Sequence, residues 1–282
     1  MFGKVFGRFF LTPHLGITDD DTPDTSTLSE LIETFEWWKD LVEQMPYTKT
    51  KKLYTMFETS DVHPKIVSAM KIFDQVVVPY QYLCDILVKH GVNCVAHGTY
   101  TSDLIRSNPK IVPNKEKNLN KLIYLYVGTN DMRKNLTSLC RVFDKVASGT
   151  DHVLIVKTNV SDNLPVSKNI KIITEKINHK KLAALYNMCD YVISFTRGEG
   201  VGLPMLEASY FGKPVVCHSQ GVFVDTKKHV RTEWIDLPAA EIPVDLTGVP
   251  KFLHEVFYGT WWDVNEEEAE KVLFTQMSTP GH

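Results

Sequence analysis

Two glutamates flank a glycine-rich stretch near residue 200, in a pattern that could hold an anion between two carboxylates. Glu199 lies within the glycines, and Glu207 follows eight positions later. The apolar run Tyr191–Phe195 predicts a strand before them, and Pro204 stands where the first turn of a helix would begin. A strand that leads through glycines into a helix directs backbone N–H groups and the positive end of the helix dipole at one place, which favours a phosphate.

The carboxylates of Glu199 and Glu207 indicate a ligand that carries hydroxyl groups as well as phosphate. Because a phosphate repels Glu199 and Glu207, we expect both to accept hydrogen bonds from hydroxyl groups instead. Hydroxyl groups on either side of a diphosphate describe a nucleotide-sugar. The alternative is a strand-helix-strand crossover in which the glycines only permit tight packing.

The whole stretch from Asp190 to Val216 resembles the signature of a known family. It has Glu-x7-Glu spacing, with Gly-x-Gly-Leu-Pro between the glutamates and Ala-Ser-x-x-Gly-x-Pro-Val-Val after the second. This pattern closely resembles that of the retaining GT-B glycosyltransferases of the "group 1" or family 4 class. The resemblance implies that Glu199 contacts the transferred sugar and that Glu207 binds the ribose hydroxyls. It also implies a donor-binding loop that contains Gly200, Gly202, Leu203 and Pro204.

A second segment resembles the first loop of the C-terminal domain in the same family. It begins at Gly128, after an apolar run, and carries Arg133 and Lys134. The resemblance implies that these cations neutralise the diphosphate as it departs, Arg133 as a fork to two oxygens and Lys134 as a point charge. Many relatives place the arginine directly after the glycine, where this chain has Thr129. The alternative is an exposed basic turn before a helix.

The first part of the chain alternates strands and helices, which predicts a parallel sheet with right-handed crossovers. Strands are expected over residues 52–58, 75–80 and 92–98, and the segment resembles, more weakly, the second half of the family's N-terminal domain. Since ligands of such sheets lie at the carboxyl ends of the strands, Glu58 and His97 are acceptor-side candidates. For His97, a core or strand-end histidine is the alternative.

Composition excludes several other classes of protein. The net charge of -3 gives no general attraction to nucleic acid, and Asp19–Asp21 lacks the preceding strand that a metal-binding pair of aspartates requires. Residues 1–11 mix aromatic and basic side chains, so contact with a lipid surface stays open beside a buried strand or turn. No apolar run is long enough for a membrane helix. The cysteines are expected to be reduced core thiols in a cytoplasmic protein, and they are Cys84, Cys94, Cys140, Cys189 and Cys217.

These observations predict an α/β, GT-B-like fold: two Rossmann-like domains that face each other across a cleft. The lysine- and proline-rich linker 107–120 divides a reduced N-terminal domain, 1–115, from a nucleotide-sugar-binding domain, 116–282. The resemblance implies that the last helix returns to the N-terminal domain.

The predicted activity is retaining transfer of a sugar from a nucleotide-sugar to a glycan, lipid-linked or protein hydroxyl. We expect no cofactor and no metal, because Arg133, Lys134 and the helix start near Gly202 already supply positive charge to the diphosphate. Two alternatives remain: an inactive GT-B-like subunit that supports a partner enzyme, and a nucleotide-sugar epimerase on the same scaffold.

Overall fold

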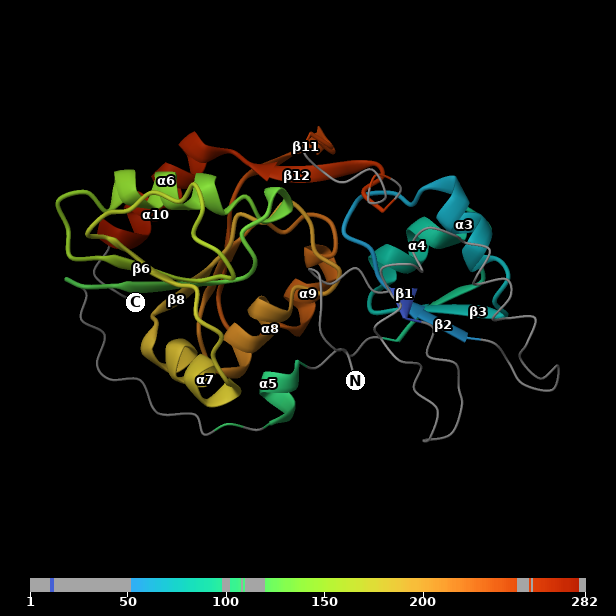
Figure 1. Ribbon diagram of the computed structural model, residues 1–282, viewed down its shortest axis with the longest axis horizontal. Coiled ribbons are helices and arrows are strands. Elements are labelled where there is room, and N and C mark those ends of the chain that lie inside the picture. Colours follow the sequence, from blue (N-terminus) through green and yellow to red (C-terminus); the bar gives the residue numbers. More distant parts are fainter. Residues whose placement is uncertain are drawn as a thin grey trace. The chain divides into compact units, whose positions relative to one another are not determined.

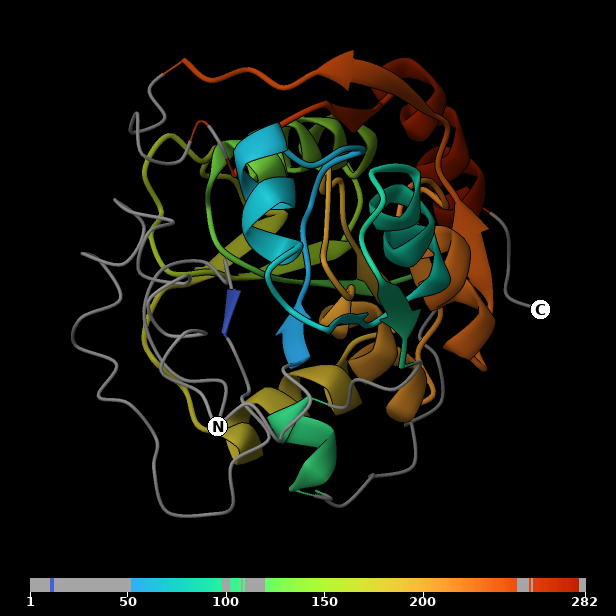
Figure 2. The same ribbon diagram turned by 90° about the vertical axis from the view of Figure 1, so that its right-hand side faces the viewer.

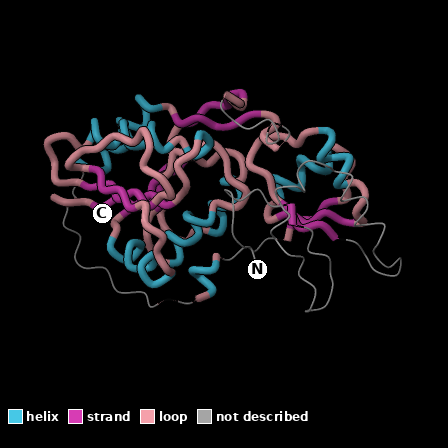
Figure 3. Tube along the Cα trace, in the orientation of Figure 1, coloured by secondary structure: helices cyan, strands magenta, loops and turns pink. Residues whose placement is uncertain are grey.

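The computed structural model describes residues 11–12, 52–97, 102–107, 109, 120–247, 254 and 256–278 (Figures 1 and 3). Within the full chain two compact units are present. The first consists of Met1–Thr99 and Pro243–Trp261, and the second of Tyr100–Ile242 and Trp262–His282. The Asp19–Asp21 segment, most of the aromatic and basic segment 1–11 and most of the linker 107–120 lie outside the described residues.

The first unit contains a four-stranded sheet in the order β1-β2-β3-β4. Strands β2, β3 and β4 pair in parallel, as the sequence predicted, and β1 joins β2 antiparallel. The strands are β1 (Leu11–Thr12), β2 (Lys52–Thr55), β3 (Gln75–Val78) and β4 (Cys94–Ala96). The crossover helices are α3 (Pro64–Met70) and α4 (Gln81–Lys89); each has buried apolar residues, and α4 contacts β3 and β4 (Figure 2).

A late segment of the chain belongs to the first unit because it bonds to the loop after β2. The Ser60 amide donates to the Thr260 carbonyl over 3.0 Å, and the Thr260 amide donates back to the Ser60 hydroxyl over 2.8 Å. Gly259 makes this approach possible, since its φ is 98° and a Cβ there would lie 2.9 Å from the Asp61 amide nitrogen. These bonds join Thr260 to the first unit, with which the segment Pro243–Trp261 is grouped.

The second unit contains a six-stranded sheet in the order β10-β9-β8-β5-β6-β7. All of its pairings are parallel. Its strands are β5 (Ile123–Val127), β6 (Val153–Lys157), β7 (Ile170–Ile173), β8 (Tyr191–Ile193), β9 (Val215–Cys217) and β10 (Trp234–Asp236). Because the strand order reverses between β5 and β8, the loops that follow these two strands border the topological switch point, where open sheets of this kind bind ligands.

Helices cover both faces of this sheet. Figure 1 shows α6 and α10 on one side and α7 and α8 on the other. The helices are α5 (Asp103–Arg106), α6 (Leu136–Val146), α7 (His179–Met188), α8 (Leu203–Tyr210), α9 (Phe223–His229) and α10 (Glu266–Ser278). A two-stranded sheet of β11 (Ala239–Pro243) and β12 (Thr260–Val264) precedes α10. Helix α5 belongs to this unit, because it packs against α7 and α8.

The last helix, α10, packs on α6 within the second unit. Ala269 and Leu273 are fully buried in the core cluster that also contains Leu139 and Phe143. On the solvent side, Arg141 pairs with Glu266, and Lys145 Nζ lies 2.6 Å from Glu270 Oε2. Burial of one apolar face against α6 thus sets the position of α10.

The cysteines behave as core residues. All five thiols are free, and all but the half-buried Cys94 are buried. Burial raises the pKa of Cys140 and of Cys189 to about 12, which keeps both thiols protonated and unreactive. Among the described residues, no helix has the length and apolarity needed to cross a membrane.

Asp190 joins the two strands at the switch point, and we expect its loss to destabilise the second unit. Its carboxylate accepts from the Ile123 amide over 2.7 Å, while its own amide donates to the Ile123 carbonyl over 2.7 Å. Asp190→Ala should lower the free energy of unfolding by about 1.5–3 kcal/mol, the usual value for a hydrogen bond to a charged group. Chemical denaturation measures this, with Asp190→Asn as the matched control because Asn keeps an acceptor oxygen. Equal losses in both variants would contradict the role of that acceptor.

Candidate functional site

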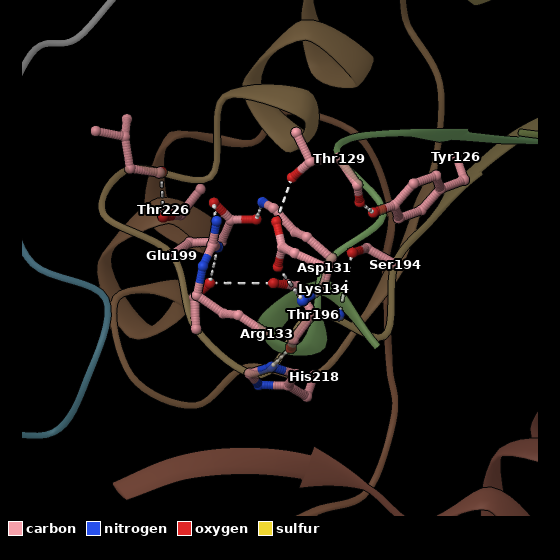
Figure 4. Close-up of polar contacts among 12 residues, drawn as sticks. Tyr126, Thr129, Asp131, Arg133, Lys134, Ser194, Thr196, Glu199, His218 and Thr226 are labelled. Carbon is pink, nitrogen blue, oxygen red and sulfur yellow. Dashed lines mark hydrogen bonds and ion pairs between the residues drawn. The ribbon is translucent and has the colours of Figure 1, made fainter. Parts of the chain in front are cut away.

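Two loops meet beyond the carboxyl ends of β5 and β8. The loop after β5, here called the basic turn, covers residues 128–135 and includes a short 3-10 helix, Met132–Lys134. The loop after β8, here called the glycine loop, covers residues 194–202 and leads into α8. Figure 4 shows side chains of both loops, among them Arg133, Lys134 and Glu199, converging on one place. The sequence-predicted Arg133, Lys134 and Glu199 are therefore brought together at the switch point of the sheet.

Asp131 shapes the basic turn. Its carboxylate caps the 3-10 helix by accepting from the Lys134 amide over 3.0 Å, and it accepts from the Thr129 hydroxyl over 2.5 Å. Burial alone would raise the pKa of Asp131, but Arg133, the Thr129 hydroxyl and Lys134 together hold this pKa below its usual value. Asp131 is therefore ionised at neutral pH and faces the two cations of the turn.

Gly128 begins the basic turn and lies against the side chain of Tyr126. A Cβ at this position would lie 2.6 Å from the Tyr126 hydroxyl oxygen. That hydroxyl donates to the Thr129 carbonyl over 2.9 Å, and burial raises the pKa of Tyr126 well above its usual value. Because Gly128 has no side chain, the Tyr126 hydroxyl can reach the Thr129 carbonyl and stabilise the start of the turn.

Hydrogen bonds join the basic turn directly to the glycine loop. The Arg197 amide donates to the Arg133 carbonyl over 2.7 Å, and the Arg133 guanidinium donates to the Gly198 carbonyl over 2.6 Å. Asp263 on β12 supports the junction, since one carboxylate oxygen accepts from Arg197 Nε over 2.6 Å and from Asn135 Nδ2 over 3.0 Å. The two loops therefore form one rigid structure, although they are 65 residues apart in the chain.

The centre of the site is a buried ion cluster. Lys134 Nζ contacts Glu199 Oε1 directly, and Arg133 Nη1 lies 3.6 Å from Glu199 Oε2 (Figure 4). Arg133, Lys134 and Glu199 are only 3%, 5% and 8% exposed. The carboxylates of Asp131 and Glu199 balance the positive charges of Arg133 and Lys134. Glu199 thus occupies the place at the cations that an anionic ligand would need, and a diphosphate must displace it or share them.

The second glutamate of the pattern lies on the buried face of α8. Glu207 is 7% exposed, and its Oε2 accepts from the Tyr186 hydroxyl of α7 over 2.6 Å. Tyr186 is itself held by stacking on Phe211, with ring centroids 5.3 Å apart. The carboxylate therefore already accepts from one hydroxyl group, which is the kind of contact that the resemblance implies for a ribose.

The remaining residues of the glycine loop shape the start of α8. Gly202 adopts the left-handed region with φ 74°, and a Cβ there would lie 2.7 Å from Phe223 Cε1. Leu203 and Pro204 form the first turn of α8, and Pro204 and Gly200 are buried. The structure thus places all of these residues at the helix start, as predicted.

The acceptor-side candidates belong to the first unit. Glu58 follows β2 and is 5% exposed, whereas His97 follows β4 and is exposed. The His97 amide donates to the Val78 carbonyl over 2.9 Å. Both residues therefore lie past the carboxyl ends of parallel strands, and their role as acceptor-side residues stays a prediction.

Sequence reasoning missed three side chains that support the site: Tyr186, His218 and Asp263. His218 directly follows β9, so the carboxyl-end rule could have found it. Tyr186 has the pattern of a core residue, and Asp263 stands far along the chain in a tryptophan-rich segment, so neither carries a sequence signal.

A model of the family "Glycosyl transferases group 1" matches residues 107–236, which include both loops. This stretch of the chain is therefore similar to that family. No curated protein matches the sequence.

Solved structures are similar at low identity. A TarM variant from S. aureus, in a complex with fondaparinux, α-GlcNAc-glycerol and UDP, is 13% identical with a TM-score of 0.54, over 80% of this chain and 44% of that one. WaaG, a glycosyltransferase of lipopolysaccharide biosynthesis, is 12% identical with a TM-score of 0.53, over 92% and 76%. Sucrose-phosphate synthase from Thermosynechococcus elongatus is 15% identical with a TM-score of 0.51, over 93% and 78%. The fold is thus the mixed α/β, parallel-sheet fold of GT-B glycosyltransferases, and the chain spans less than half of the TarM chain.

The ion cluster predicts that Glu199 competes with anions for Lys134 and Arg133. Glu199→Gln should bind inorganic pyrophosphate about tenfold more tightly than the unmodified chain, because Gln keeps a hydrogen-bond acceptor but loses the competing charge. Isothermal titration calorimetry measures this affinity, and Glu241→Gln, an exposed residue on β11, is the matched control. Weaker binding by the Glu199 variant would contradict competition.

Proposed function

We propose that this chain is a retaining, metal-independent glycosyltransferase that moves a sugar from a nucleotide-sugar donor to a hydroxyl acceptor. The observation that carries the proposal is the meeting of Arg133, Lys134 and Glu199 at the switch point between β5 and β8. Parallel sheets bind nucleotides at such points, and the matched family model supports the class of reaction.

Each group in the cluster has a chemical role in the proposed reaction. Lys134 and Arg133 stabilise negative charge that develops on the departing nucleoside diphosphate, and the amino-terminal end of α8 adds its dipole. Glu199 leaves Lys134 as the diphosphate takes its place and then accepts a hydrogen bond from the transferred sugar. Because these cations already stabilise the leaving group, we propose that no metal ion is needed for its departure.

Glu207 is assigned to the nucleoside end of the donor. Its carboxylate accepts from Tyr186 in the structure, and we propose that it also accepts from the ribose hydroxyls of the bound nucleotide. Retention follows in this proposal if the acceptor attacks from the face that the diphosphate leaves, with a diphosphate oxygen taking the acceptor's proton. No strong protein base is then required.

The proposal is tested by incubating the purified protein with UDP-, GDP- and ADP-sugars in the presence of EDTA, and following sugar release and transfer by NMR. We expect one class of donor to raise the melting temperature and to be turned over slowly, with the anomeric configuration kept in the product. Stabilisation without any turnover, across varied acceptors, would favour the inactive subunit. Interconversion of the sugar without transfer would favour an epimerase.

We expect loss of Glu199 to affect turnover and loss of Glu207 to affect nucleotide binding. Glu199→Ala should cut turnover by at least about 100-fold, the scale for loss of a group that acts on the reacting centre, without weakening donor binding to the same degree. Glu207→Ala should mainly weaken binding of the nucleoside diphosphate. Steady-state kinetics together with calorimetry measure both quantities. Equal losses of turnover and affinity in the two variants would remove the assigned division of roles.

Lys134 should act through the phosphates of the donor. Lys134→Ala should weaken binding of the nucleoside diphosphate by roughly 10- to 100-fold, the scale of a charge-assisted hydrogen bond, and leave the free nucleoside unchanged. Competition calorimetry with the two ligands measures the difference, and the exposed Lys168 provides Lys168→Ala as a matched control. An identical loss for both ligands would contradict a phosphate contact.

A further inference from the structure

His218 is a buried histidine that follows β9 and lies beneath the glycine loop. Its side chain is 1% exposed. Its Nε2 lies 2.7 Å from the Thr196 carbonyl oxygen, and its Nδ1 accepts from the Gln220 amide over 3.2 Å. Each ring nitrogen therefore has a backbone partner on a different loop.

These partners determine the protonation state of the ring. A carbonyl oxygen can only accept, so Nε2 carries a hydrogen, and a backbone amide can only donate, so Nδ1 carries none. Burial lowers the pKa of His218, which favours the same neutral form. His218 is therefore a neutral imidazole that donates one hydrogen bond to the glycine loop.

Thr196, whose carbonyl accepts from His218, also bonds within the glycine loop through its hydroxyl group. The Thr196 hydroxyl donates to the Gly198 carbonyl over 3.0 Å, and the same carbonyl accepts from the Arg133 guanidinium over 2.6 Å. Gly198 is followed directly by Glu199. A continuous series of hydrogen bonds thus leads from His218 through Thr196 and Gly198 to Arg133 (Figure 4).

Phe223, which contacts His218, also packs against the other end of the glycine loop, at Gly202. The Phe223 ring stands edge-on to the imidazole, with centroids 5.1 Å apart and planes at 77°. Phe223 also fills the space that a Cβ at Gly202 would need, 2.7 Å from its Cε1. Hence His218 supports the start of the loop by a hydrogen bond and its end through Phe223.

From this geometry we propose that His218 is a positioning residue of the donor site, which holds the glycine loop so that Arg133 and Glu199 face the diphosphate. The inference rests on the proposed function, because it assigns the ion cluster to the diphosphate. It goes beyond that function by naming a side chain that the glutamate and glycine pattern does not contain.

Two amide variants separate the two ring nitrogens. His218→Gln carries an N–H donor near the position of Nε2, whereas His218→Asn is shorter and reaches only the position of Nδ1. With inorganic pyrophosphate as the probe, His218→Asn should bind about tenfold more weakly than the unmodified chain, and His218→Gln within about threefold of it. Calorimetry measures both affinities, and circular dichroism checks that both variants are folded.

The outcomes distinguish this inference from the function on which it rests. Unchanged pyrophosphate binding in a folded His218→Asn, or equal losses in both variants, would overturn the positioning role and leave the proposed function intact. No pyrophosphate binding by the unmodified chain would overturn both. Nitrogen-15 NMR of the unmodified chain keeps the inference testable if the variants do not fold: we expect a one-bond coupling to hydrogen at Nε2 of His218 and none at Nδ1. The opposite pattern, or a doubly protonated ring at neutral pH, would also overturn it.

Discussion

The contact on which the site depends is the ion pair between Lys134 and Glu199. It joins the basic turn after β5 to the glycine loop after β8, and both partners are almost completely buried. Removing charges from water costs several kcal/mol for each ion, so a pair of this kind persists only where further hydrogen bonds support it. Here that support comes from Asp131, from the Gly198 carbonyl and from the Arg197 amide, which together make the two loops one structure.

The same arrangement explains how the site could favour a charged leaving group. Cations held at fixed positions in a region poor in water stabilise developing negative charge more than mobile surface cations do, because no reorganisation is needed during the reaction. Before a ligand binds, Glu199 supplies the negative charge that these cations require. In the proposed reaction, exchange of this carboxylate for a diphosphate would link binding of the donor to release of Glu199, which would then be available to the sugar.

Much of the second unit follows from local signals in the chain. The strand predicted over Tyr191–Phe195 occurs as Tyr191–Ile193, and the helix predicted to begin near Pro204 begins at Leu203, because an apolar run and a proline in the first turn define them locally. In contrast, the segment Pro243–Trp261 is grouped with the first compact unit, which local signals in the chain do not indicate. Its place depends on Gly259 and on hydrogen bonds between Ser60 and Thr260, partners 200 residues apart that no local pattern connects.

For the site, too, some features follow from the local sequence and others only from the tertiary structure. The amino-acid sequence by itself determined which residues carry the charges, since the spacing of Glu199 and Glu207 and the adjacent Arg133 and Lys134 are written in order along two short segments. Only the tertiary structure decided that Lys134 pairs with Glu199, that Tyr186 donates to Glu207, and that His218 holds Thr196. The physical reason is that parallel strands distant in the chain end at one edge of the sheet, so side chains meet there through strand order, which sequence spacing does not encode.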